Sequence, residues 1–193
     1  MLRKIVFMLI ALSVILTTSG QDTDSKTALL LIDIQDFYFP GGDLPLYKPE
    51  VVAENAAMIQ KEFRKKGNEV IHVRHNYEPG GNIHDAVKPM NGEKVFSKDN
   101  VNAFLDTGLK QYLDDQQITS LVICGMQTHM CVEATVRAAS DMGYECILIQ
   151  DACTSRDLTF DGQTIKAMDV HLSTLSTLSS YARLMSTMNY INP

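Results

Sequence analysis

Three residue types that together support thiol chemistry occur far apart in the sequence, at Asp33, Lys98 and Cys131. A cysteine thiolate is a nucleophile, a carboxylate can remove the thiol proton, and an ammonium can stabilise the thiolate. Each residue alone also has a simpler interpretation: a small buried hydrophobe, a strand-end acid or a solvated surface lysine. Sequence spacing does not prove that the three meet, so the elements around them matter.

Cys131 follows a strand pattern and a short polar turn. The run 118–124 is apolar and β-branched, which is typical of a buried parallel strand, and helix-forming residues extend from Met130 until Gly143. Cys131 should therefore lie in the first helical turn, where free N–H groups and the helix dipole favour a thiolate. The local pattern alone leaves both a nucleophile and a buried hydrophobe open.

Strand and helix patterns alternate along the chain. Strands are predicted over 27–34, 68–75, 118–124 and 144–150, with a last short one over 184–187. Helices are predicted over 49–67, 101–117, 131–143 and 163–181. This alternation indicates right-handed βαβ crossovers and a parallel sheet with helices on both faces.

The carboxyl ends of parallel strands build the site in such a sheet, so the residues just past each strand are the ones to search. Asp33 is the most informative, because it interrupts the apolar run 29–32 and a charge at a buried strand end needs a cationic partner or a proton. The same search yields Gln35, His75 and Tyr77, with Lys98 before the helix predicted over 101–117.

Length and composition are those of an ordinary soluble globular protein, since 193 residues with 45% hydrophobic and 21% charged residues fit one domain. The segment 1–20 has two basic residues, a short apolar run and then small residues, which predicts a signal peptide and export to the periplasm or medium. An uncleaved membrane anchor is the alternative; after cleavage no stable membrane insertion is expected.

The net formal charge of −6 and the lack of a basic run exclude an electrostatic case for nucleic acid. The four cysteines do not have the paired spacing of a structural zinc site, and the chain is too large to need a disulfide framework. Whether a disulfide forms among Cys124, Cys146 and Cys153 is left open.

Three ordered motifs resemble the isochorismatase-like cysteine hydrolase family: LLLIDIQDFYFPGG (29–42), VFSKDNVNAF (95–104) and GMQTHMCVEATVRAASDMGYECILIQDAC (125–153). The resemblance covers the chain from about residue 26 to 187. It implies a three-layer α/β/α domain over 26–190, with a central, mainly six-stranded parallel sheet of the Rossmann-like kind.

The resemblance also implies residue roles. Asp33 matches the general base and acid of the family, Lys98 its lysine and Cys131 its nucleophile. A cis peptide is implied between Met126 and Gln127, with the N–H groups of Gln127 and Cys131 aimed at a developing oxyanion. The implied reaction is hydrolysis of an amide-type C–N bond through a thioester, without a cofactor.

Nicotinamidases of this superfamily carry a metal site that begins with an Asp-x-His pair, and this chain has His75-Asn76-Tyr77 at the aligned place. His72, His75 and His84 could supply ligands, but His72 and His75 differ by three along a strand and should point to opposite faces. No metal and no nicotinamidase activity are therefore expected. The segment 125–131 instead resembles metal-free, amidohydrolase-like members similar to streptothricin hydrolase.

The substrate is expected to be a small molecule, although its identity does not follow from the sequence. Tentative substrate contacts are Gln35, Phe39, His75, Tyr77, Phe104 and His129. Phe104 could equally be core, and His129 a helix-start residue. The resemblance further implies a homo-oligomer.

Two other classes of function stay open beside the amide hydrolase. One is an isochorismatase-type or nicotinamidase-type hydrolase, and the other is a non-catalytic exported binding or redox protein on the same fold. The complete set of Asp33, Lys98 and Cys131 favours a hydrolase, because a degenerate member would have no reason to keep all three.

Overall fold

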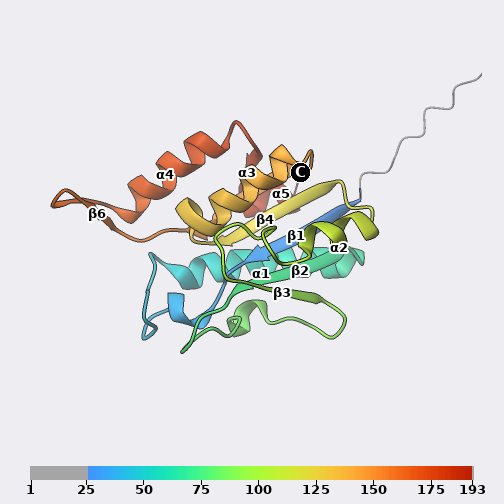
Figure 1. The fold of residues 1–193 in the computed structure, drawn as a ribbon, viewed down its shortest axis with the longest axis horizontal. Coiled ribbons are helices and arrows are strands. Elements are labelled where there is room, and N and C mark those ends of the chain that lie inside the picture. Colours follow the sequence, from blue (N-terminus) through green and yellow to red (C-terminus); the bar gives the residue numbers. More distant parts are fainter. Residues whose placement is uncertain (1–25, 193) are drawn as a thin grey trace, which may run out of the picture.

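A computed structural model describes residues 26–192 of the chain (Figure 1). The expected signal peptide over 1–20 lies outside these residues. Among the helices of residues 26–192, none combines the length and the apolar character that crossing a bilayer requires.

Six strands in this part of the chain form one parallel sheet in the order β3-β2-β1-β4-β5-β8. Their bounds are β1 Thr27–Ile32, β2 Glu69–His75, β3 Lys94–Lys98, β4 Ser120–Met126, β5 Glu145–Thr154 and β8 Arg183–Met185. Every residue of β4 and all but the first of β1 are buried, as expected for strands covered on both faces. The predicted six-stranded parallel sheet is confirmed.

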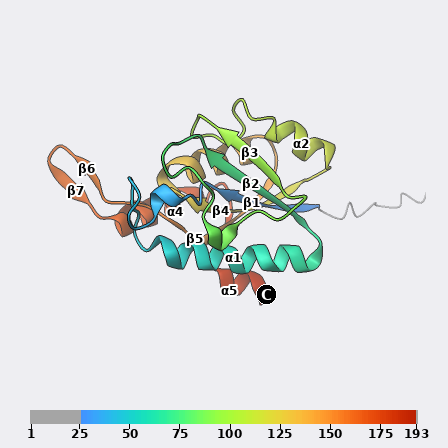
Figure 2. The ribbon, with the colours of Figure 1, turned by 90° about the horizontal axis from the view of Figure 1, so that it is seen from below.

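Helices cover both faces of the sheet. Helix α1 (Pro49–Lys66) packs with α5 (Thr187–Ile191) on one face, and α2 (Leu109–Asp115) and α3 (Glu133–Asp141) lie on the other (Figures 1 and 2). Helix α4 (Ala167–Leu178) packs against α3. The helix predicted over 49–67 is confirmed as α1: Pro49 starts it, and Gly67 ends it in the left-handed conformation at φ 69°.

The chain builds the sheet outward from β1 in two directions, first to β2 and β3 and then, after crossing back, to β4 and β5. The carboxyl ends of β1 and β4 therefore meet at a topological switch point. Ile32 lies opposite Gly125, and His75 at the end of β2 lies opposite Lys98 at the end of β3. This register places the ends of four neighbouring strands at one edge of the sheet.

The helix predicted over 101–117 is shorter than expected, because α2 begins only at Leu109. Asp106 and Gly108 have positive φ angles of 57° and 75°, and the Thr107 hydroxyl donates to the Ala103 carbonyl at 2.6 Å. Such local side-chain bonds compete with a helical backbone. Lys98 correspondingly ends strand β3, which the sequence patterns did not predict.

The helix predicted over 163–181 begins with a hairpin instead. Strands β6 (Leu158–Phe160) and β7 (Gln163–Ile165) pair antiparallel around Asp161 and Gly162, whose φ angles of 48° and 72° give a tight turn of the primed type. This hairpin projects from the body of the molecule, and α4 follows it (Figures 1 and 2).

Gly125 allows β4 to pack closely beside β1 just before the turn that leads to Cys131. Its φ angle is 135°, and a Cβ atom at this position would lie 2.0 Å from the carbonyl oxygen of Ile32. No side chain fits there unless the two strands separate. The close approach of β1 and β4, and with it the placement of the residues that follow each strand, depends on this glycine.

We expect Gly125→Ala to lower the free energy of unfolding by at least about 3 kcal/mol, because it adds a backbone clash to an unfavourable φ. Gly143→Ala is the matched control: Gly143 also has a positive φ, 88°, but nothing lies within 4 Å of the added Cβ atom. That variant should lose only about 1 kcal/mol. Denaturant unfolding measures both losses, and equal losses would contradict the importance of the clash.

Candidate active site

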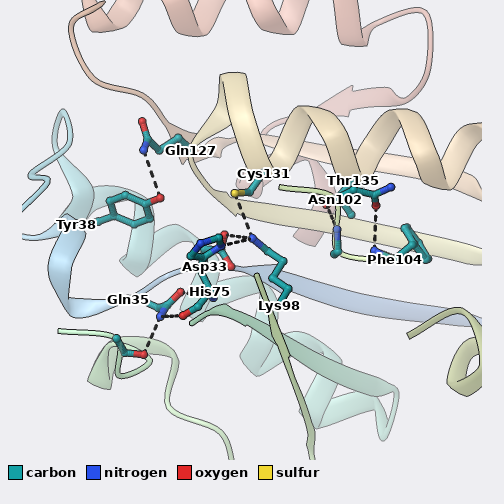
Figure 3. A network of polar contacts seen from close by, with 12 residues as sticks. Asp33, Gln35, Tyr38, His75, Lys98, Asn102, Phe104, Gln127, Cys131 and Thr135 are labelled. Atoms are coloured by element: carbon teal, nitrogen blue, oxygen red, sulfur yellow. Dashed lines mark hydrogen bonds and ion pairs between the residues drawn. The ribbon is translucent and has the colours of Figure 1, made fainter. Parts of the chain in front are cut away.

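The Lys98 ammonium lies at the centre of a buried polar cluster at the carboxyl edge of the sheet (Figure 3). Its Nζ atom donates to Asp33 Oδ2 at 2.7 Å and to Cys131 Sγ at 3.2 Å, and lies 3.2 Å from His75 Nδ1. Asp33 is fully buried, Lys98 is 1% exposed and Cys131 is 4% exposed. The structure therefore brings together Asp33, Lys98 and Cys131, the three residues for which the sequence predicts thiol chemistry, and places His75 beside them.

Asp33 directly follows β1 and has a left-handed backbone with φ 47°, a conformation that aspartate tolerates better than most residues. Its N–H donates to the Val73 carbonyl at 2.9 Å, which ties this residue to β2. Within residues 26–192, its buried Oδ1 atom has no hydrogen-bond partner. One carboxylate oxygen thus holds Lys98, and the other can accept a proton.

Cys131 lies in a π-helical turn, Thr128–Val132, that continues directly into α3. It is therefore in the first helical turn, as predicted. Burial, reinforced by the Asp33 carboxylate and opposed by Lys98, raises the pKa of its thiol to about 12. The expectation that this position favours a thiolate is not met in the resting centre, because burial disfavours the charged form of the sulfur.

Burial also raises the pKa of the Asp33 carboxyl above its ordinary value, although Lys98 opposes this shift. A raised pKa makes the carboxylate a better acceptor for a thiol proton. Because one ammonium lies against both groups, moving the proton from Cys131 to Asp33 leaves the net charge of the cluster unchanged. The centre can therefore form a thiolate without creating a new uncompensated charge in the interior.

The turn between β4 and Cys131 contains a cis peptide bond between Met126 and Gln127, the bond for which the family resemblance implies one. The Gln127 side chain is buried, and its Nε2 donates to the Tyr38 hydroxyl at 3.3 Å. Sequence reasoning missed Tyr38, which lies in the 3-10 turn Asp36–Tyr38. The only signal for it was a run of three aromatic residues soon after Asp33.

The Gln35 side chain is engaged in hydrogen bonds to the backbone and is not available to a substrate. Its Oε1 accepts from the His75 N–H at 2.7 Å, and its Nε2 donates to the carbonyls of His75 at 2.9 Å and Gly81 at 2.7 Å. Gln35 is fully buried, so these bonds satisfy its side chain. Instead of the substrate contact proposed from the sequence, the structure shows a clamp on the end of β2.

The other tentative substrate contacts do not all converge on Cys131. His129 Nδ1 lies 3.0 Å from the hydroxyl oxygen of Ser155. The Phe39 ring stacks on His84 with ring centroids 3.7 Å apart.

Of the remaining three tentative contacts, His75 lies in the cluster around Lys98, whereas Tyr77 and Phe104 lie in different surroundings. The Tyr77 hydroxyl donates to Asp43 at 3.2 Å and so joins two loops at the carboxyl edge. Phe104 instead stacks on Tyr144, which precedes β5 at the opposite end of the sheet. Figure 3 shows Phe104 well apart from Asp33 and Cys131, so its core interpretation holds.

The described residues contain one group of three potential metal ligands, Asp33, His75 and Cys131. The Lys98 ammonium already lies within hydrogen-bond distance of all three, so this set does not fit a resident metal ion. His72 lies outside this group: its buried Nε2 atom is 3.0 Å from Glu93 Oε2. All four cysteines are buried and carry free thiols.

Comparison with known proteins places this geometry in a family. The isochorismatase domain matches residues 27–180. A solved structure described as an isochorismatase hydrolase from Oleispira antarctica is 43% identical, covers 90% of this chain and 100% of its own, and superposes with a TM-score of 0.85. The chain therefore belongs to the isochorismatase family of hydrolases.

Two curated relatives have names that state an activity. Streptothricin hydrolase from Streptomyces noursei is 30% identical over 140 residues, which are 68% of this chain and 50% of that protein. Maleamate amidohydrolase from Pseudomonas putida is 32% identical over 158 residues, which are 68% of this chain and 73% of that protein. The resemblance to amidohydrolase-like members of the family is confirmed.

The cluster predicts how the reactivity of Cys131 depends on its neighbours. Lys98→Met removes the cation that stabilises the thiolate, so we expect it to slow alkylation of Cys131 by iodoacetamide at neutral pH at least about tenfold, whereas Asp33→Asn removes a carboxylate that raises the thiol pKa and should not slow it. Peptide mass spectrometry measures the rate at each cysteine. Lys110→Met serves as control, because Lys110 pairs with Asp114 on the exposed surface of α2. A native rate in folded Lys98→Met would contradict the coupling.

Proposed function

We propose that this protein hydrolyses an amide-type C–N bond of a small molecule, with Cys131 as nucleophile and a thioester as intermediate. The observation that carries the proposal is the Lys98 ammonium, which bonds Asp33 and Cys131 at once in a buried centre. This arrangement supplies a nucleophile, a base and a cation in direct contact. Amide hydrolysis by a cysteine nucleophile can proceed with these three groups and without a cofactor.

In the first half of the reaction, Asp33 takes the thiol proton while Cys131 Sγ forms a bond to the carbonyl carbon. The carbonyl oxygen becomes an oxyanion, for which the N–H groups of Gln127 and Cys131 are the proposed donors. The C–N bond then breaks, and Asp33 returns the proton to the departing nitrogen. The products of this half are the free amine or ammonia and an acyl thioester on Cys131.

In the second half, water attacks the thioester carbonyl and Asp33 accepts the proton of the water. The C–S bond breaks, a carboxylic acid leaves, and the proton on Asp33 returns to the Cys131 sulfur. The sum is amide plus water giving acid plus amine, with the enzyme restored. Lys98 remains an ammonium throughout and compensates whichever of Asp33 and Cys131 carries the negative charge.

The relatives support the class of bond. One is named for hydrolysis of streptothricin, and the other is named an amidohydrolase acting on maleamate. A buried thiol next to a carboxylate base is suited to acyl transfer, because the same carboxylate can protonate the leaving nitrogen. The choice of acyl and amine portions depends on the loops around Tyr38 and Tyr77.

Cys131→Ala should abolish release of ammonia or amine from any substrate found in a panel of small amides, because the thioester can no longer form. In the unaltered protein, acid quenching during turnover should trap the acyl group as added mass on the peptide that contains Cys131. Colorimetric amine detection and peptide mass spectrometry make the two measurements.

Cys146→Ala is the matched control for this experiment. Cys146 is also a buried free thiol, but it lies near the amino end of β5, away from the cluster. Its loss should leave amide turnover unchanged. Full amide turnover by Cys131→Ala would overturn the proposal, and cleavage of a vinyl ether by both the unaltered protein and Cys131→Ala would indicate an isochorismatase-type reaction instead.

A further inference from the structure

We propose that His75 is a positioning residue of this centre: as a neutral imidazole, it accepts a hydrogen bond from Lys98 and so holds the ammonium between Asp33 and Cys131. The inference rests on the proposed function, because it concerns how the same centre is kept in its reactive arrangement. The reaction as written above needs only Asp33, Lys98 and Cys131. His75 is a fourth residue, to which that reaction gives no part.

The Lys98 ammonium has three N–H donors and no acceptor. Three acceptor atoms lie within reach of Lys98 Nζ: Asp33 Oδ2 at 2.7 Å, Cys131 Sγ at 3.2 Å and His75 Nδ1 at 3.2 Å. Each donor therefore has one partner. Without His75, one N–H of a buried cation would lose its protein partner, which is costly in a site this dry.

The backbone of His75 is held firmly at the edge of the sheet. His75 and Lys98 lie directly opposite each other at the ends of β2 and β3. Gln35 bonds both the N–H and the carbonyl of His75, and the Asn76 N–H donates to the Lys98 carbonyl at 2.8 Å. A side chain on a backbone fixed at both polar groups can hold another group in place precisely. Figure 3 shows Gln35, His75 and Lys98 as neighbouring parts of one network.

The contact between Lys98 and His75 requires one protonation state of the imidazole. An ammonium can donate to Nδ1 only if Nδ1 carries no proton, so the imidazole must be neutral, with its proton on Nε2. The charged and titratable groups around the ring are Lys98, Asp33, Asp99 and the Cys131 thiol. Burial and Lys98 lower the pKa of His75, while Asp33 and Asp99 oppose this, and the net direction is downward.

The lowered pKa of His75 determines how the reactivity of Cys131 should change with pH. Above its lowered pKa the ring is neutral and accepts from Lys98. As the pH falls through that pKa, Nδ1 gains a proton and two cations face each other, so the Lys98 ammonium is displaced from Cys131. We therefore expect the reactivity of Cys131 to fall in acid with a step that belongs to His75, in addition to any step from Asp33.

Two substitutions distinguish the effect of the hydrogen-bond acceptor of His75 from the effect of its bulk. Asparagine places its side-chain oxygen close to where histidine has Nδ1, so His75→Asn keeps an acceptor that does not titrate. His75→Leu keeps bulk and removes the acceptor. The control is Asn76→Ala, since Asn76 lies at the same strand end but its side chain donates to Asp99 on the surface.

The rate of alkylation of Cys131 by iodoacetamide across acid to alkaline pH is the main measurement, because it needs no substrate. We expect His75→Leu to slow it at neutral pH at least about tenfold, by loss of a hydrogen bond to a charged group. His75→Asn should stay within about threefold of the unaltered protein and lose the acid step that belongs to His75. Asn76→Ala should match the unaltered protein in rate and pH profile.

The kinetic constants on an amide substrate provide a second readout. His75→Leu should lower kcat more than it raises KM, because the residue positions the reacting groups without touching substrate. Two-bond ¹H–¹⁵N spectra of histidine-labelled protein provide a third, which needs no substitution. The expected tautomer of His75 carries its proton on Nε2.

The outcomes distinguish this inference from the proposed function. If Cys131→Ala hydrolyses amides as fast as the unaltered protein, the proposed function itself fails. If Cys131 is reactive but a folded His75→Leu matches it in rate and pH profile, the positioning role is wrong while the hydrolase stands. Should His75→Leu not fold, an unchanged acid step in His75→Asn, or a proton on Nδ1 in the spectra, overturns the inference by itself.

Discussion

The buried ion pair between Lys98 and Asp33 is the interaction on which the rest of the site depends. Lys98 Nζ lies 2.7 Å from Asp33 Oδ2, and both side chains are inaccessible to solvent. Either charge alone at this depth would cost several kcal/mol, so each residue offsets much of the cost of burying the other. The fold must therefore bring the ends of β1 and β3 together across β2, which the parallel order and register of these strands achieve.

This pair also explains how a buried thiol can react. Cys131 is the third group against the same ammonium, and both acids have pKa values raised by burial. Proton transfer from thiol to carboxylate exchanges one anion for another beside a fixed cation. The interior that makes an isolated thiolate unfavourable therefore does not oppose this transfer, because the net charge stays the same.

The sequence predicted what depends on local pattern and missed what depends on distant contacts. Continuous apolar runs identified β1, β4 and β5, and the carboxyl-edge rule led to Asp33 and His75. Strand β3 was missed because it begins and ends with lysine and most of it is exposed or half-buried, so it has no apolar run. Asp161-Gly162 was a hairpin signal that the helical composition of the following residues obscured.

The errors about side chains have a common physical cause. The role of Gln35 and the pKa of Cys131 are both decided by residues more than thirty positions away, and neither burial nor hydrogen-bond partners can be inferred from spacing. A polar residue past a strand end is therefore ambiguous in sequence: Asp33 faces the reactive thiol, while Gln35, two positions later, holds backbone. Only the hydrogen-bond partners that each residue finds in the fold distinguish the role of Asp33 from that of Gln35.

The raised pKa of Cys131 also bears on thiol redox chemistry, the other use of a cysteine beside a base. Redox-sensing cysteines are accessible and of low pKa, since the thiolate is the form that oxidants attack. Cys131 is 4% exposed, and burial keeps its thiol protonated at rest. In the proposed reaction this centre forms the thiolate only by internal proton transfer to Asp33, rather than holding it at rest. That property favours hydrolysis over redox sensing, because in the proposed reaction the proton that Asp33 takes from sulfur is the one that a leaving amine requires.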